Sequence, residues 1–223
     1  MLLGRRLVAE ALGTAFLLVA IVGSGITSDR LAGGNLAMEL LAVSFATGVT
    51  LFALILVLGP ISGGHFNPAV TLCDALRSGT SWRHVIPYAS AQIAGAFAGA
   101  ATANLMFGLP AVGLSGHART GSGQLLGEFV ATFGLLAIVW GCSRLRSPIS
   151  PLAIGGYIAA AIWFTSSTAF ANPAVTLART ISDTFTGIRP ADAPAFIAIQ
   201  LLGALGATAL FAWLAPSERI REA

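Results

Sequence analysis

The chain has 223 residues, of which 56% are hydrophobic and only 9% are charged, with a mean hydropathy of +0.83. A soluble domain of this length could not bury so many apolar side chains, so the composition predicts that the solvent is lipid. The net charge of +3 comes from 12 basic residues, all of them arginine, against 9 acidic ones. We attribute this charge to membrane topology and find no nucleic-acid-binding patch in it.

Six apolar stretches each have about the length, roughly 20 residues, that a helix needs to cross a bilayer. They cover residues 7–26, 35–58, 85–107, 124–142, 149–168 and 193–215. The first stretch is too long, and too well followed by others, to be a cleaved signal peptide. The chain is therefore predicted to be an all-α protein of the cell (inner) membrane, with lipid as its surroundings.

The arginines indicate an orientation. With the N-terminus inside, eight arginines are cytoplasmic and four are outside, which agrees with the positive-inside rule. The inside set is Arg5, Arg6, Arg77, Arg83, Arg144, Arg146, Arg219 and Arg221, and the outside set is Arg30, Arg119, Arg179 and Arg189. Both termini are therefore expected to be cytoplasmic.

One hexapeptide, Asn-Pro-Ala-Val-Thr-Leu, occurs at 67–72 and again at 172–177. Asparagine is a preferred helix N-cap and proline is preferred at the first helical position, so each copy predicts a helix start. Each such helix is predicted to be short: from Pro68 the apolar run reaches only Asp74 and Arg77, and about ten residues at roughly 1.5 Å each span on the order of 15 Å, half of the hydrocarbon core. Two such half-spanning helices at matching places indicate a transport site near the bilayer midplane.

Other landmarks also occur twice and in the same order. Glu10 lies four residues before a threonine in the first apolar stretch, and Glu128 has the same spacing in the fourth; Gln92 and Gln200 mark the third and sixth. Each half holds three full spans, an odd number, so the second half enters the membrane upside down. We predict one channel domain over 1–223, with repeats at 1–107 and 124–223 joined by a loop at 108–123.

The segment Ser62-Gly63-Gly64-His65-Phe66-Asn67-Pro68-Ala69-Val70-Thr71, with the second Asn-Pro-Ala, resembles the major intrinsic protein family of aquaporins and aquaglyceroporins, over essentially the whole chain. The resemblance implies six tilted transmembrane helices, two re-entrant half-helices meeting at the midplane, one pore per subunit and a homotetramer. The implied pore motifs are Asn67, Pro68, Ala69, Asn172, Pro173 and Ala174.

The same resemblance implies roles for three further residues. Glu10 and Glu128 would accept hydrogen bonds from the backbone of the re-entrant loops, whose N–H groups lipid cannot satisfy. His65 would lie on the cytoplasmic part of the pore wall. At the midplane, the positive ends of two half-helix dipoles would disfavour cations and interrupt proton hopping.

The selectivity filter departs from the pattern of water-selective members, which have arginine three residues after the second Asn and an aromatic residue on the second span. This chain has Val175 and Thr47 there, and Ala169 at a third position. The fourth position is Ile162 by alignment on the fifth span or Ala160 by counting back from Asn172, and we favour Ile162. No choice restores a cation, so the charge barrier is expected at the midplane alone.

Replacing arginine and an aromatic residue by valine and threonine widens the constriction and removes donors, so larger uncharged solutes are expected to pass. The loop Phe164-Thr165-Ser166-Ser167-Thr168 before the second motif resembles the bacterial branch associated with arsenic resistance. This implies arsenite, As(OH)3, and related metalloid hydroxides as solutes, with glycerol and water also possible. The alternative is a general water and glycerol channel with no metalloid role.

Two other classes of protein were weighed. A metalloenzyme would need His65, His84 and His117 together, but the predicted segments scatter them and no HExxH-type spacing occurs. Cys73 and Cys142 offer neither a disulfide framework nor metal-ligand spacing, so no cofactor is expected. A junction-forming membrane protein with a closed pore would need larger loops.

Overall fold

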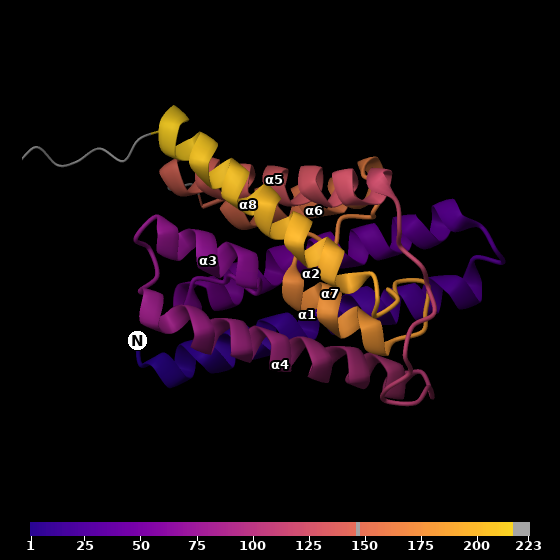
Figure 1. The fold of residues 1–223 in the computed structure, drawn as a ribbon. Coiled ribbons are helices and arrows are strands. Elements are labelled where there is room, and N and C mark those ends of the chain that lie inside the picture. The colour runs from indigo at the N-terminus through magenta and orange to yellow at the C-terminus, as the bar shows by residue number, and fades with distance from the viewer. Residues whose placement is uncertain (146–147, 216–223) are drawn as a thin grey trace, which may run out of the picture.

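The computed structural model describes residues 1–145 and 148–215. These residues form eight α-helices and one 3-10 turn, with no β-strand among them (Figure 1). The elements are α1 (Leu3–Leu31), α2 (Leu36–Ser62), α3 (Pro68–Leu76), α4 (Trp82–Met106), α5 (Ser122–Leu145), α6 (Ser150–Phe164), α7 (Pro173–Ala178), η1 (Arg179–Ile181) and α8 (Ala193–Leu214). The predicted cytoplasmic Arg146, Arg219 and Arg221, and the C-terminus, lie outside the described residues.

Each predicted apolar stretch corresponds to one long helix. Four of them, α1, α2, α5 and α8, are long and apolar enough to cross a membrane by length and composition. The prediction for the fifth stretch, 149–168, was too long, because α6 ends at Phe164. Thr165 has an extended backbone and Thr168 a positive φ of 59°, so the chain turns there into the loop that leads to α7.

The long helices pack in two similar groups. Helix α1 packs against α4 and α2, α5 packs against α8 and α6, and α2 and α6 join the two groups. Small residues permit the closest contacts: a Cβ on Gly95 or Gly99 would lie 2.1 Å from the backbone oxygen of Ala11 or Ala15. Glycine thus brings α4 against the backbone of α1, as small residues do between membrane helices.

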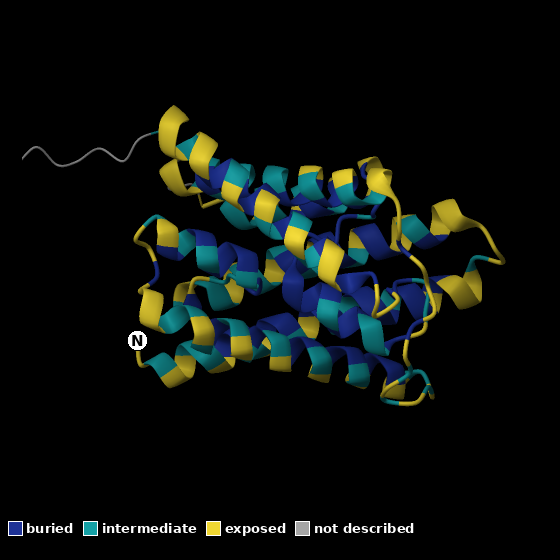
Figure 2. Ribbon diagram, in the orientation of Figure 1, coloured by how far each residue is buried: buried dark blue, intermediate teal, exposed yellow. Residues whose placement is uncertain are grey.

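The outer surface of the helices is apolar while polar side chains lie inside. Val8, Leu12 and Phe16 follow one face of α1 and are exposed, whereas Glu10 and Thr14 on the same helix are fully buried. Figure 2 shows this arrangement for the whole molecule, with buried residues between the helices and exposed ones on the outer faces and ends. An apolar outside and a polar inside suit a protein whose solvent is lipid.

The two short helices begin where the sequence predicts, immediately after Asn67 and Asn172. Helix α3 has nine residues, close to the predicted ten. Helix α7 has six residues and continues directly into the 3-10 turn η1. Such turns are common at helix ends, where they satisfy carbonyl groups that the helix leaves free.

Candidate pore and its filter

Each short helix is capped by the side chain of its own asparagine. Asn67 Oδ1 accepts a hydrogen bond of 2.9 Å from Ala69 N, and Asn172 Oδ1 accepts one of 2.9 Å from Ala174 N. With proline at the first helical position of both, the cap explains why each helix begins at this point. The positive ends of both helix dipoles lie at these caps.

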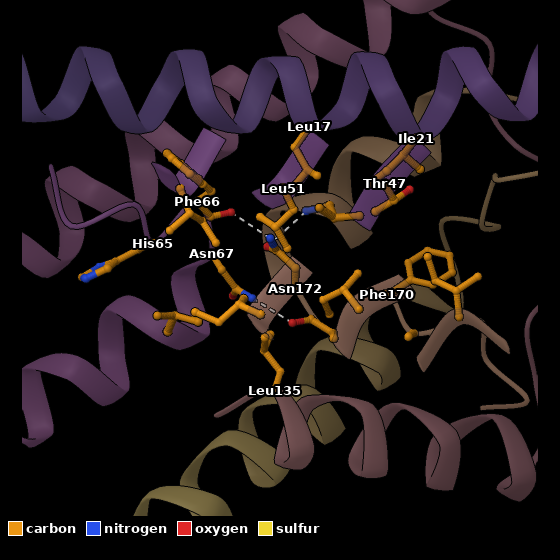
Figure 3. A pocket seen from close by; sticks show the side chains of 18 of the residues that line it. Leu17, Ile21, Thr47, Leu51, His65, Phe66, Asn67, Leu135, Phe170 and Asn172 are labelled. Carbon is orange, nitrogen blue, oxygen red and sulfur yellow. Dashed lines mark hydrogen bonds between the residues drawn. The ribbon is translucent and has the colours of Figure 1, made fainter. Parts of the chain in front are cut away.

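The same two side chains tie the short helices together. Asn67 Nδ2 donates to Ala171 O at 2.8 Å, and Asn172 Nδ2 donates to Phe66 O at 2.8 Å, as the dashed lines in Figure 3 show. Each asparagine therefore caps one half-helix and reaches the backbone of the loop that leads into the other. The two N-termini meet in the interior of the molecule.

Glu10 holds the loop before α3 in place. Its Oε1 accepts from Ser62 Oγ at 2.6 Å and from His65 N at 3.1 Å, and its Oε2 accepts from Phe66 N and Gln92 Nε2, both at 2.7 Å. The carboxylate is fully buried. Its oxygens serve backbone N–H groups that would otherwise have no partner in lipid.

Glu128 does the same for the loop before α7. Its Oε1 accepts from Phe170 N at 2.8 Å, and its Oε2 accepts from Ala171 N at 2.9 Å and from Gln200 Nε2 at 2.6 Å. Phe66 and Ala171, the residues just before the two asparagines, have positive φ of 48° and 49°. A non-glycine residue keeps this conformation only where its surroundings impose it, as these carboxylates do.

A cavity of about 220 Å³ runs past both caps. Asn67 and Asn172 lie in its middle, with His65 toward one end and Phe170 toward the other (Figure 3). Its remaining walls are mostly aliphatic, from residues such as Leu51 and Ile158. An interior passage lined by hydrocarbon, with a few polar groups at fixed points, is what a selective pore requires.

All four favoured filter residues line this cavity: Thr47, Ile162, Ala169 and Val175. Ala160, the other candidate for the fifth span, is not among the lining residues. The ambiguity could not be removed by counting, because the length of the loop between Phe164 and α7 was unknown. None of the four side chains carries a charge.

His65 also lies on the cavity wall. Its Nδ1 is 3.0 Å from Thr71 Oγ1, and its Nε2 is 3.6 Å from Asp74 Oδ2. Thr80 donates to the same Asp74 oxygen at 2.6 Å. The imidazole is thus hydrogen-bonded through Nδ1 and has a carboxylate near Nε2, at the end of the cavity away from Phe170.

Two arginines that the sequence analysis placed only on the outer side, Arg119 and Arg179, are among the cavity-lining residues that it did not assign to the pore. Arg179 lies four residues after Val175, a spacing that places two residues on one helix face and could have drawn attention to it. Arg119 belongs to the loop at 108–123, which was read only as a linker, and no local pattern marks it. Burial lowers its pKa to about 10, although Glu128 acts in the opposite direction, so it is charged at neutral pH.

Two half-helices that meet inside a bundle of apolar helices, beside a lined cavity, define a membrane channel. Comparison with known proteins agrees. The profile of the family described as Major intrinsic protein matches residues 2–169, and the chain belongs to this family. Its members are channels rather than enzymes, so the chain is an integral membrane channel for small solutes.

Several relatives resemble most of the chain. It is 51% identical to "Aquaglyceroporin AqpS" of Rhizobium meliloti over 95% of this chain and 91% of that protein. It is 36% identical to "Aquaporin Z" of Photorhabdus laumondii over 68% of this chain and 71% of that protein. The crystal structure of the aquaglyceroporin from Plasmodium falciparum has the same fold, with a TM-score of 0.73 at 21% identity over 96% and 95% of the two chains.

Proposed function

We propose that the chain is a passive channel for small neutral solutes, above all arsenite and related metalloid hydroxides, with glycerol and water also passing. The observation that carries this proposal is the chemistry of the four predicted filter residues. Thr47, Ile162, Ala169 and Val175 line one cavity and include neither an aromatic ring nor a cation. A constriction of this kind favours a compact polyol over a single file of water.

Arsenite suits such a passage because As(OH)3 is an uncharged polyol close to glycerol in size. It offers three hydroxyl groups for hydrogen bonds and no charge to desolvate. The name aquaglyceroporin, borne by the relative that is 51% identical, supports solutes of this size here too. In this proposal Asn67 and Asn172 keep a side-chain N–H for a passing hydroxyl group, since each is shown donating only one bond.

We further propose how the channel assembles and how it is oriented in the membrane. The chain would form a homotetramer of independent pores in the inner membrane, with both termini in the cytoplasm. Residues 1–107 and 124–223 would be two inverted repeats joined by the loop 108–123. The exposed apolar faces of the long helices, such as that of α1, support contact with lipid or with neighbouring copies.

The deciding experiment is a stopped-flow assay on liposomes that contain the purified protein. Water, glycerol and arsenite permeabilities are measured in parallel and compared with those of empty liposomes. The proposal expects protein-dependent flux of all three, with arsenite at least as fast as glycerol. Flux of water and glycerol without arsenite would instead make the chain a general water and glycerol channel.

A further inference from the structure

Arg119 and Arg179 place two guanidinium groups at the Phe170 end of the cavity. Their Cζ atoms lie 4.8 Å and 3.4 Å from the centroid of the Phe170 ring, so both cations stack on the same aromatic side chain. Arg119 and Arg179 are only 7% and 5% exposed, although both line the cavity. The two charges therefore lie in the wall of the passage and not in the outer solvent.

In the described part of the chain, residues 1–145 and 148–215, no acidic group forms an ion pair with either guanidinium. Glu128, the carboxylate that acts electrostatically on both, is occupied by backbone donors and by Gln200. Asp192 accepts from the backbone N of Arg119 and pairs with Arg189 instead. The cavity wall thus carries two positive charges that its surroundings leave unpaired.

The two arginines differ in how many donors they use. Arg119 donates through Nε to Gly187 O at 2.8 Å, and its Nη groups reach the carbonyls of Ser167 and Phe185. This arginine is held by the loops. In the described part of the chain Arg179 donates only through Nε, to Thr186 O, so its two terminal amino groups remain available.

Arg179 also lies close to the predicted filter along the chain. It follows Val175 by four residues, about one turn or 5.4 Å along the helix axis, on the same face. Side chains on a helix lean toward its N-terminus, so a residue covers surface over the preceding turn. We therefore expect the guanidinium of Arg179 to lie over the turn that contains Val175, where it stacks on Phe170 at the cavity wall.

We infer that Arg119 and Arg179 form a cationic site at the outer end of the filter. This site excludes cations, and the free N–H groups of Arg179 donate hydrogen bonds to the hydroxyl groups of neutral solutes. Val175 leaves the family's usual arginine position without a charge, and this pair supplies the charge from one turn farther along and from the loop at 108–123. The inference deepens the proposed function and rests on it, because it assigns a selectivity element to the same passage.

The test measures ion leak separately from solute flux. Arg179→Gln removes the charge from the arginine of the pair that donates fewer hydrogen bonds to the protein. Arg30→Gln is the matched control. Arg30 is exposed, stacks on Phe107 and does not line the cavity. Proteoliposomes receive a potassium diffusion potential, and a trapped pH dye reports proton entry, while water flux above that of empty liposomes shows an assembled pore.

We expect proton or potassium leak to rise at least tenfold in Arg179→Gln and to stay at the parental value in Arg30→Gln. Arg179→Lys keeps the charge and should keep the exclusion, and Val175→Arg combined with Arg179→Gln should restore it. An assembled Arg179→Gln channel as tight to cations as the parent would overturn the inference, whatever the solute measurements show. If Arg179→Gln does not assemble, Arg119→Gln tests the same leak.

The parent protein provides an arm that needs no substitution. Its residual electrolyte leak should favour chloride over potassium, because two unpaired guanidinium groups attract anions. A preference for potassium would contradict the proposed cationic site. Failure of the proposed function is a different result. If the parent channel excludes cations but carries neither arsenite nor glycerol, the cationic site is supported and the proposed solutes are wrong.

Discussion

Val175 lies on the wall of the cavity at α7, where we propose that it sets the width of the passage. Its side chain is buried and lines the cavity together with Thr47 and Ile162. Because this residue lines the cavity, we expect the size of its side chain to affect the local diameter. Valine contributes only two methyl groups, which neither donate hydrogen bonds nor reach across the cavity.

We predict that Val175→Arg reduces arsenite and glycerol flux at least tenfold while water flux falls much less. The guanidinium adds five donors and a fixed charge, and it narrows the passage. Water exchanges bulk hydrogen bonds for those donors, whereas a polyol meets a steric barrier, and each 1.4 kcal/mol of barrier costs about tenfold in rate. Stopped-flow permeabilities of the assembled variant provide the measurement.

Thr47→Phe serves as the companion variant, because it narrows the same constriction from α2. Its effect should have the same direction, and the double variant should lose less than the product of the two single losses. Unchanged arsenite flux through a well-assembled Val175→Arg channel would show that Val175 does not form the constriction, and the solute proposal would lose its main support.

Mercury gives a second prediction at the scale of single residues. Mercury-sensitive water channels commonly have cysteine three residues before the second Asn, where this chain has Ala169. The two native cysteines lie elsewhere: Cys73 is fully buried, Cys142 is half-buried, and neither lines the cavity. We expect flux to be insensitive to mercuric ion in the parent and in Cys73→Ser.

Ala169→Cys is the positive control for that experiment, because it puts a thiol on the cavity wall. It should create a block that reducing agent reverses. Strong inhibition of the parent that Cys73→Ser removes would mean that the thiol of Cys73 is reached from the passage, against its placement in the structure.

Single residues show where the sequence was informative. Thr47, Ala169 and Val175 were assigned by counting from the two asparagines along the pattern of the family that the sequence resembles, and all three line the cavity. Arg119 could not be found that way, because it is brought to the cavity by the hydrogen bonds that it donates to the carbonyls of Ser167 and Gly187, far along the chain. Positions set by local geometry are readable, and positions set by loop packing are not.

At the scale of elements, the half-helix α7 depends on a carboxylate from another helix. Glu128 of α5 accepts from Phe170 N, Ala171 N and Gln200 Nε2. Glutamine has the same shape but only one oxygen, and its amino group would face donors. At least one buried N–H would then lose its acceptor, at a cost of about 1–3 kcal/mol for each such group.

We therefore predict that Glu128→Gln lowers the midpoint of thermal unfolding in detergent and the yield of assembled channel. Asp29→Asn is the matched control, since it neutralises an exposed carboxylate on α1 and should leave the midpoint unchanged. A Glu128→Gln channel that unfolds at the parental temperature would mean that the carboxylate does not support the loop, and a proton-relay role would then need testing through the pH dependence of flux.

The elements themselves were largely predictable. The repeated Asn-Pro start and the matching Glu and Gln residues placed both short helices and their supports, because capping and burial in lipid leave few alternatives. The end of α6 was predicted too late in the sequence. This helix stops where the chain turns into the loop before α7, and that turn is set by contacts such as Ala169 N to Thr165 Oγ1 at 3.0 Å, which apolar periodicity does not reveal.

For the whole molecule, orientation in the membrane follows from charge. We propose that the ends of the chain are cytoplasmic, which puts Cys142, beside Arg144 near the end of α5, on the same side. The loop at 108–123 would then be outside, with Ala118 exposed in it. Moving several arginine side chains across a bilayer is costly, so one orientation should dominate.

We predict that Cys142 reacts with a bulky, charged maleimide in inverted membrane vesicles but not in intact cells. Cys73 is fully buried and should not react from either side, so Cys142→Ser should abolish labelling. In that background Ala118→Cys should give the opposite pattern, with labelling in intact cells. The parent and the Ala118→Cys variant then each report one face of the membrane, because the reagent is too large to pass through the pore. Labelling of Cys142 from outside the cell would reverse the orientation, and with it the assignment of the arginine pair to the external end of the passage.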